Sequence, residues 1–358
     1  MSKKLSIPFL VLPLFMTLLP LAAAGQPHYK QTNLVSDVPD LAATTDPDLV
    51  NPWGLSRSAT SPWWVSDNGT GKSTLYNAAG AKLALVVTVP PASGSTPTGT
   101  VFNGGSGFVV TQGSASGAAR FLFATEDGTI SGWSPAVDAT HAIIAVDKAG
   151  TAIYKGMTLA TFNNATYLYV ANFKSGQVEV YSSTWAETSA PGGFADPLLP
   201  PGYAPFNVQN IGGHIFVMFA KQGQLPDEAE GRGLGYVDEF DGVGNLLLRL
   251  QHGPWLNAPW GVAQSPARFG QFSDNILVGN FGSGEIAAFD PATGEFRGRL
   301  HGPRGTLVIP GLWAIAFGGG TANNGATTDL FFTAGIDDEE HGLFGTLTPV
   351  AKGDDDDD

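Results

Sequence analysis

The chain has 358 residues, with 18 Lys or Arg against 32 Asp or Glu and a net charge of −14. A chain this acidic lacks the basic patch that phosphate neutralisation needs, so nucleic acid and anionic membrane surfaces are poor partners. It contains 47 Gly, 25 Pro and no Cys, and long stretches with a helical period are missing. The composition therefore favours an all-β fold with many tight turns and no disulfides.

The chain begins with a segment typical of a secretory signal peptide. Lys3 and Lys4 form its charged start, an apolar run interrupted by Pro follows, and residues 22–24 supply a small-residue cleavage site. We expect residues 1–24 to be removed and the mature protein to be secreted, to the extracellular space or the periplasm. An uncleaved membrane anchor is the alternative, although the apolar run is short for a transmembrane helix.

A repeated pattern follows along the rest of the chain. Six times a bulky or polar residue precedes a small one at the start of an apolar run, and successive pairs lie 45, 57, 51, 54 and 53 residues apart. The pairs are Trp53-Gly54, Thr98-Gly99, Lys155-Gly156, Phe206-Asn207, Trp260-Gly261 and Trp313-Ala314. This period is typical of a four-stranded propeller blade. The sequence predicts a six-bladed β-propeller of antiparallel blades over residues 25–350.

Short apolar runs separated by turn residues follow each pair, as expected of blade strands. The expected blades span about residues 50–90, 97–147, 154–200, 204–251, 257–301 and 310–349. A polar insertion over residues 221–233 interrupts the fourth blade and is predicted to be a loop. A further strand is expected over residues 29–36. Because it precedes the first blade, it is the candidate to close the ring by completing the last one.

The repeated pair has a physical explanation in this fold. Innermost strands converge on the propeller axis, where a side chain beyond the first atom would collide with its neighbours, so a small residue is needed. We expect the adjacent Trp or Phe to point away from the axis into the space between blades. Burial of one such ring contributes about 2–3 kcal/mol.

Two sets of polar residues are candidates for a site. The first set lies on the innermost strands near the expected channel, and consists of Asn51, Asn103, Asn207, Gln209 and Asn257. These amides either bind a ligand or hold water and satisfy backbone groups. The second set ends the second strand of successive blades, and consists of Asp67, Glu126, Asn172, Lys221 and Asn280, with Gly335 breaking the pattern. Two interpretations are open for this set. The residues bind a ligand or a cation on one face of the propeller, or they only cap the turns that follow the strands.

An acidic run lies in the expected hairpin of the last blade. Asp337, Asp338 and Glu339 are candidate metal ligands, because carboxylates in a loop can coordinate calcium. The alternate-position spacing of a calcium loop is missing, so a solvated acidic turn is the alternative. The terminal residues 351–358, which end in five Asp, are expected to form a disordered acidic tail.

Two histidines recur in similar surroundings. His252 and His301 both precede Gly-Pro and lie 49 residues apart. A pair of imidazoles could act as acid and base or bind a transition metal, whereas a structural copy within the repeat is the alternative. The chain has no nucleophile elbow, phosphate loop, HExxH or paired-Cys motif.

Several longer segments resemble a known family. They are residues 49–55, 97–103, 257–261, 277–282 and 332–336, and they are similar to a bacterial family of exported, uncharacterised proteins that often carry C-terminal sorting signals of the Pro-Glu-Pro type. The resemblance extends over residues 29–349. It implies a propeller-like fold and export, with no established activity and no catalytic residues to transfer. This chain ends in an Asp run where many members have a sorting helix. The blade pattern more distantly resembles NHL-type repeats and six-bladed lactonases.

These observations favour a secreted binding or interaction module. Its expected partner is an extracellular polysaccharide or a surface protein, with Trp63, Trp133 and Trp185 as exposed rings that could stack on sugars. The alternative is a calcium-dependent hydrolase or lyase of the lactonase type at the central channel, where calcium would polarise a carbonyl. Calcium is the one cofactor that the pattern suggests, and the innermost strands supply no carboxylate for it.

Overall fold

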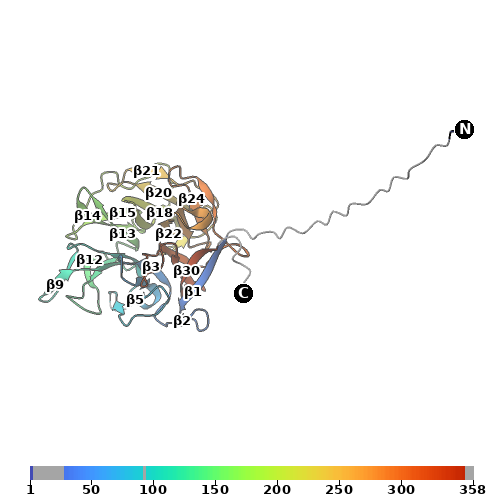
Figure 1. The fold of residues 1–358 in the computed structure, drawn as a ribbon. Helices are drawn as coiled ribbons and strands as arrows, with labels where there is room; N and C mark the ends of the chain where they lie inside the picture. Colours follow the sequence, from blue (N-terminus) through green and yellow to red (C-terminus); the bar gives the residue numbers. More distant parts are fainter. Residues whose placement is uncertain (3–27, 92–93, 351–358) are drawn as a thin grey trace.

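The computed structural model describes residues 1–2, 28–91 and 94–350. Over these ranges the chain forms six small antiparallel sheets that are arranged as blades around a common centre (Figure 1). Helical structure in the described part consists of two single-turn 3-10 helices, η1 (Asn68–Thr70) and η2 (Gly270–Phe272). The predicted all-β, six-bladed propeller with antiparallel four-stranded blades is therefore confirmed. The expected signal peptide and acidic tail lie outside the described residues.

In the first five blades the strands follow one another outward in chain order. The first blade consists of β3 (Pro52–Ser56), β4 (Trp63–Asp67), β5 (Lys72–Tyr76) and β6 (Val87–Thr88). The second consists of β7 (Pro97–Phe102), β10 (Phe121–Thr125), β11 (Thr129–Trp133) and β12 (Ile143–Asp147). The third consists of β13 (Tyr154–Phe162), β14 (Ala165–Asn172), β15 (Gln177–Ser182) and β16 (Glu187–Thr188). The fourth blade contains β17 (Tyr203–Ile211), β18 (His214–Gln222), β20 (Gly235–Phe240) and β21 (Leu246–Arg249). The fifth consists of β22 (Pro259–Gln264), β23 (Ile276–Asn280), β24 (Ile286–Phe289) and β25 (Phe296–Arg299).

The sixth blade combines the two ends of the described chain. It contains β28 (Leu312–Phe317), β29 (Leu330–Ile336), β30 (His341–Val350), β1 (His28–Ser36) and, parallel to β1, the short β2 (Thr44–Thr45). The strand β1 is antiparallel to β30, from the pair His28 and Val350 to the pair Ser36 and Leu343. There are two additional hairpins in the described part. One, β8 (Val109–Gln112) with β9 (Ala115–Ala118), lies between the first two strands of the second blade, and the other, β26 (His301–Gly302) with β27 (Gly305–Thr306), connects the fifth and sixth blades.

The innermost strands contact one another in order around the ring, and β28 contacts β3 again. Glycines allow this close approach. A Cβ at Gly99 would lie 2.6 Å from the Met157 backbone nitrogen on the next innermost strand, and one at Gly54 would meet the Thr98 carbonyl. The small residue of each repeat therefore lies where neighbouring backbones nearly touch, as the convergence of the strands predicts.

The aromatic residues of the repeat do not lie between the blades, and this expectation was wrong. Trp53 stacks on Trp313 with ring centroids 3.5 Å apart, and it lies 6.5 Å from Phe206. Because Trp53 and Phe206 come from the first and fourth blades, which face each other across a six-bladed ring, their rings can meet only near the axis. Atoms that line an empty channel would have no van der Waals partners on that side, so a channel filled by large rings is more stable. We call this set the aromatic plug; it consists of Trp53, Phe173, Phe206, Trp260, Phe281 and Trp313.

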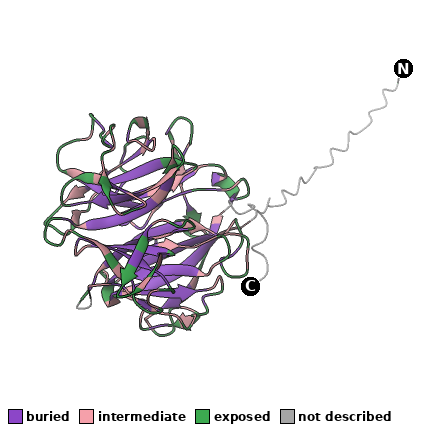
Figure 2. Cartoon of the chain, turned by 90° about the vertical axis from the view of Figure 1, so that its left-hand side faces the viewer, coloured by how far each residue is buried: buried purple, intermediate pink, exposed green. Residues whose placement is uncertain are grey.

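Residues of the second and third strands fill the space between blades instead. Trp63 packs on Phe331 with centroids 4.8 Å apart, and Trp64 stacks on Phe121 at 3.9 Å. Figure 2 shows the result, with buried strands inside the blades and exposed residues concentrated in the loops. In the described part of the chain, no helix has the length and hydrophobicity to cross a membrane.

Candidate functional site

A cavity of about 540 Å³ opens over one side of the aromatic plug. Its lining comes from five blades and from the insertion in the fourth, and Trp53 and Phe281 of the plug contribute to it. A second cavity, of about 30 Å³, lies on the innermost strands and includes Trp260 of the plug. We call the larger cavity the acidic mouth. Its size is that of a small-molecule site.

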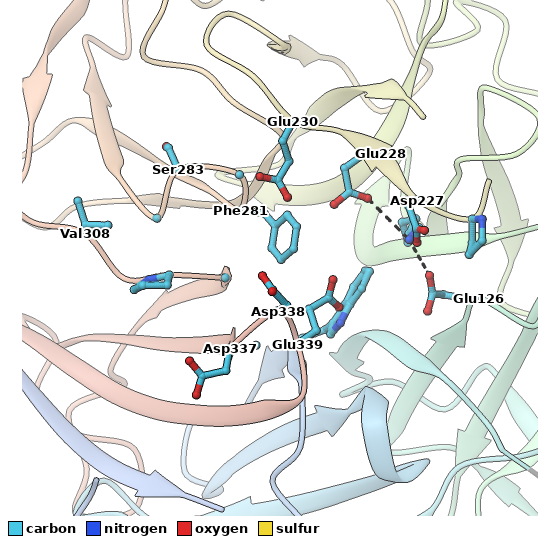
Figure 3. Close-up of a pocket in the computed structure, with 18 residues that line it drawn as sticks. Glu126, Asp227, Glu228, Glu230, Phe281, Ser283, Val308, Asp337, Asp338 and Glu339 are labelled. Atoms are coloured by element: carbon cyan, nitrogen blue, oxygen red, sulfur yellow. Dashed lines mark hydrogen bonds and ion pairs between the residues drawn. The ribbon is translucent and has the colours of Figure 1, made fainter. Parts of the chain in front are cut away.

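Carboxylates dominate the acidic mouth. Seven of the described residues that line it are acidic and one, Lys155, is basic. The acidic residues are Glu126, Asp227, Glu228, Glu230, Asp337, Asp338 and Glu339. Figure 3 shows the carboxylates of Glu228, Glu230 and Asp338 around the ring of Phe281, with Asp337 farther out.

Lys155 is a buried cation at the inner end of the mouth. Its residue is 1% exposed, and its Nζ donates a hydrogen bond of 2.6 Å to Glu126 Oε1. The same Nζ lies 4.0 Å from Glu228 Oε2 and 4.8 Å from the ring centroid of Trp53. Burial alone would lower the pKa of Lys155, but the carboxylates of Glu126 and Glu228 outweigh burial and raise it. Lys155 is therefore a fixed positive charge.

Glu228 comes from the insertion of the fourth blade, residues 221–233. The prediction of a loop over the whole insertion was wrong, because it contains the short strand β19 (Glu228–Ala229), which pairs with the end of β18. This pairing carries the Glu228 side chain into the mouth, where it is 6% exposed. Burial raises the pKa of Glu228 to about 7, although the charge of Lys155 opposes this shift. Glu228 can therefore gain or lose a proton near neutral pH.

The acidic run between β29 and β30 forms another side of the mouth. Asp337, Asp338 and Glu339 have φ values of 53°, 53° and 67°, a left-handed conformation that costs energy in residues other than Gly. Asn51 Nδ2 donates a hydrogen bond of 2.6 Å to Glu339 Oε2. Burial raises the pKa of Glu339, and the Asn51 hydrogen bond opposes this. The strained turn thus holds carboxylates over the plug.

The structure separates the five candidate amides. Asn51 alone among them hydrogen-bonds to a carboxylate of the mouth, whereas Asn207 and Gln209 line the smaller cavity. Asn103 donates to the carbonyls of Gly107 and Ala119 and so holds a loop. Asn257 Oδ1 accepts a hydrogen bond of 2.6 Å from the Gly231 amide, which ties the insertion to the fifth blade.

Of the second polar set, Glu126 and Gly335 line the mouth. Asn172 Oδ1 accepts the Ser175 amide, as expected of turn capping, and its Nδ2 donates to Glu179. Asn280 Oδ1 accepts the Asn257 amide, and its Nδ2 donates to the Glu285 carbonyl. Asp67 is fully buried, and its Oδ2 accepts the Thr74 amide. Burial raises the pKa of Asp67 well above its usual range. Lys221 Nζ donates to the Pro201 carbonyl.

The predicted metal ligands Asp337, Asp338 and Glu339 lie in the mouth, but they are not arranged around a common point. Across the described ranges, no group of three or more His, Cys, Asp or Glu is placed to hold a metal ion. His252 stacks on Tyr236 with centroids 4.3 Å apart, and His301 belongs to the β26–β27 hairpin.

The expectation of exposed tryptophans was wrong. Trp63 is 0% and Trp133 is 8% exposed, because both pack between blades. Trp185 is half-buried against Phe108, and its Nε1 donates to the Val109 carbonyl. These rings do not form a sugar-stacking surface.

Sequence reasoning missed Lys155 and the insertion residues Asp227, Glu228 and Glu230 as members of the site. Two signals could have found them. Lys155 is a cation at a repeat position that is aromatic in four of six copies, and the insertion carries three acidic residues within four positions.

No protein-family model matches the chain. It is 31% identical over 331 residues to the uncharacterized protein R648 of Acanthamoeba polyphaga mimivirus, covering 89% of this chain and 80% of that protein. It is 32% identical over 334 residues to the uncharacterized protein L690 of the same virus, covering 89% and 85%. The chain belongs to the family of these viral proteins.

Two solved structures share the propeller fold. One is a streptogramin B lyase, which aligns with a TM-score of 0.52 and 11% identity over 90% of this chain and 98% of that chain. The other is the soluble aldose sugar dehydrogenase of Escherichia coli, with a TM-score of 0.53 and 13% identity over 90% and 100%. At such identities the likeness extends to the fold alone.

Proposed function

We propose that this protein is an exported propeller that binds a ligand in the acidic mouth. The observation that carries the proposal is the buried charge of the mouth, where Glu228 and Glu339 have raised pKa values and Lys155 is 1% exposed. Buried, perturbed ionisable groups in a cavity of this size are typical of functional sites. The leader-like residues 1–24 and the resemblance to exported bacterial proteins support export.

The test is a melting curve of the chain without residues 1–24, recorded with soluble oligosaccharides, short peptides, phenethylamine, calcium chloride and a chelator. A ligand at 100 times its Kd should add about 2.7 kcal/mol to the free energy of unfolding. We expect at least one compound to stabilise the wild type and not the Glu228→Gln, Glu339→Gln double variant. Glu295→Gln, on an exposed side chain of the fifth blade, is the matched control. Equal stabilisation of both proteins by every active compound would contradict a ligand site in the mouth.

A second candidate function is that of a hydrolase or lyase. The observation in its favour is a carboxyl group with a pKa of about 7, Glu228, beside a buried ammonium group, Lys155. Such a group can act as a general acid or base at neutral pH. Calcium-dependent chemistry of the lactonase type has less support, because the described carboxylates form no metal-binding group. Turnover of a lactone panel that falls 10²–10⁴-fold in Glu228→Gln, about the usual contribution of such a group, would favour the enzyme.

A further inference from the structure

We propose that the acidic mouth binds an organic ammonium cation, an amine or quaternary ammonium group on an apolar body. This inference rests on the proposed function, because it names the class of ligand for the same cavity.

The first step concerns charge. Among the described residues, seven carboxylates and one ammonium group line the mouth, and the ammonium group of Lys155 is already 2.6 Å from Glu126. An anionic ligand would meet the remaining carboxylates and be repelled. A neutral ligand would cover Glu228 and Glu339 without giving either a charged partner, and buried charges without partners are costly. A cation is the ligand that lowers this cost.

The second step concerns the apolar part of the lining. Trp53, Pro226, Phe281, Val308 and Pro310 share the cavity with the carboxylates. A bare metal ion gains nothing from these side chains, and the described carboxylates form no metal-binding group. Aromatic faces attract ammonium groups, with about 0.5–2 kcal/mol per contact. The structure contains an example in Lys155, whose Nζ lies over the rings of Trp53 and Phe206.

The third step concerns Glu228, which has no cation within hydrogen-bond distance among the described residues. The Glu228 side chain is 6% exposed, and the cation nearest to it among the described residues is Lys155, at 4.0 Å. That separation exceeds hydrogen-bond distance. An ammonium N–H would give Glu228 the direct, charge-assisted bond that it lacks.

Binding of a cation should be linked to proton release. Near a bound ammonium group the carboxylate form of Glu228 is favoured, so its pKa falls from about 7 in the free protein. Below that pH the proton must leave before the cation binds, and the affinity falls by up to about tenfold per pH unit. Above that pH the carboxyl is already ionised, so the affinity should be constant.

The experiment is calorimetry with phenethylamine, which is charged over this range, and with its neutral isostere phenethyl alcohol, at pH 6 and pH 8. We expect the amine to bind at least tenfold more tightly than the alcohol, and several-fold more weakly at pH 6 than at pH 8. Glu228→Gln should weaken binding and reduce the pH dependence, of which Glu339, whose pKa is also raised, supplies the remainder. Phe281→Leu should weaken it at both pH values. Glu295→Gln should bind as the wild type does.

The inference is overturned if the alcohol binds as tightly as the amine, or if calcium chloride displaces the amine at comparable concentration. It is also overturned if the amine fails to bind while an oligosaccharide or peptide stabilises the wild type and not the Glu228→Gln, Glu339→Gln variant. In that last case the ligand site in the mouth stands and only the ligand class is wrong. Circular dichroism and melting curves establish that each variant is folded.

Discussion

Lys155 occupies the position that is aromatic in four of the six repeats. Its ammonium group lies against the aromatic plug, where most other repeats place a ring. Its Nζ lies within 4.8–5.8 Å of the ring centroids of Trp53, Phe173 and Phe206. Burial of a charge costs several kcal/mol unless it is paired. The contacts to Glu126 and to the rings offset that cost, so Lys155 belongs both to the core and to the site.

We expect Lys155→Met to lower the free energy of unfolding by about 3–5 kcal/mol, because it leaves Glu126 and Glu228 in the mouth without their cation. Chemical denaturation at pH 8 measures this loss. The double variant Lys155→Met, Glu126→Gln should recover part of it. Lys174→Met, on an exposed side chain, should change stability by less than about 0.5 kcal/mol. A Lys155→Met protein as stable as the wild type would show that the ion pair contributes nothing.

At the scale of single residues the sequence predicts some members of the site, but it does not predict that they lie together. Glu126 and Asp337–Glu339 stand out as polar groups that end strands or fill a hairpin. Lys155 does not, because a pattern defined as a bulky or polar residue before a small one accepts Lys and Trp alike. The pattern describes size and position, whereas the role of Lys155 depends on charge and on partners from other blades.

Among the elements, the innermost strands show most clearly what a local pattern can predict. Spacing and residue size correctly indicate that these strands approach one another at Gly, Ala or Asn. The pairing of β3 with β4 is irregular between Pro52 and Leu55, so regular strand alternation does not decide where Trp53 and Gly54 point. The pattern does not indicate which side chains face the channel, and it predicts the orientation of the aromatic plug wrongly.

The close approach of innermost strands leads to a prediction for Gly99→Ala. The new Cβ would lie 2.6 Å from the Met157 nitrogen and 2.9 Å from Gly156 Cα, both of them backbone atoms that cannot rotate away. We expect a loss of about 1–3 kcal/mol in the free energy of unfolding, the usual cost of overpacking. Gly302→Ala is the matched control, since its nearest contact would be 3.8 Å from the new Cβ. Equal melting temperatures for the two variants would contradict this account.

The insertion of the fourth blade shows what a local pattern does not predict. Its polar composition is that of a solvated loop, and it begins with residues that prolong β18. The pairing of β19 with β18 is set by where the chain returns, not by local propensity. The residues therefore favour a loop, although the paired segment is what brings Glu228 into the mouth.

On the scale of the whole molecule, the period of the repeat is sufficient to predict the number of blades. It also implies that hairpins between second and third strands lie on one face, which is why residues far apart in sequence, such as Glu126 and Asp338, share the mouth. The plug and the cavity above it depend on which side chains meet at the axis. That outcome belongs to the assembled ring and cannot be read from any one repeat.

Closure of the ring by β1 stays a prediction that truncation can test. The strand pairs with β30 in the sixth blade, Tyr29 and Val35 are 2% and 0% exposed, and the Tyr29 hydroxyl donates a hydrogen bond of 2.8 Å to the Phe269 carbonyl of the fifth blade. Burial of a side chain of this kind contributes about 1.5–3 kcal/mol. Removal of residues 25–37 should therefore lower the melting temperature sharply and expose the edge of β30.

The matched control is removal of residues 351–358, which should leave the melting temperature unchanged. If the shortened protein does not fold, Tyr29→Phe provides a milder test, since it removes only the hydroxyl that joins β1 to the fifth blade. That hydroxyl also accepts a hydrogen bond of 3.3 Å from the Phe272 amide, so we expect the variant to lose about 1–3 kcal/mol, the usual contribution of two hydrogen bonds. A melting curve unchanged by either alteration of β1 would mean that contacts among the innermost strands hold the ring closed without it.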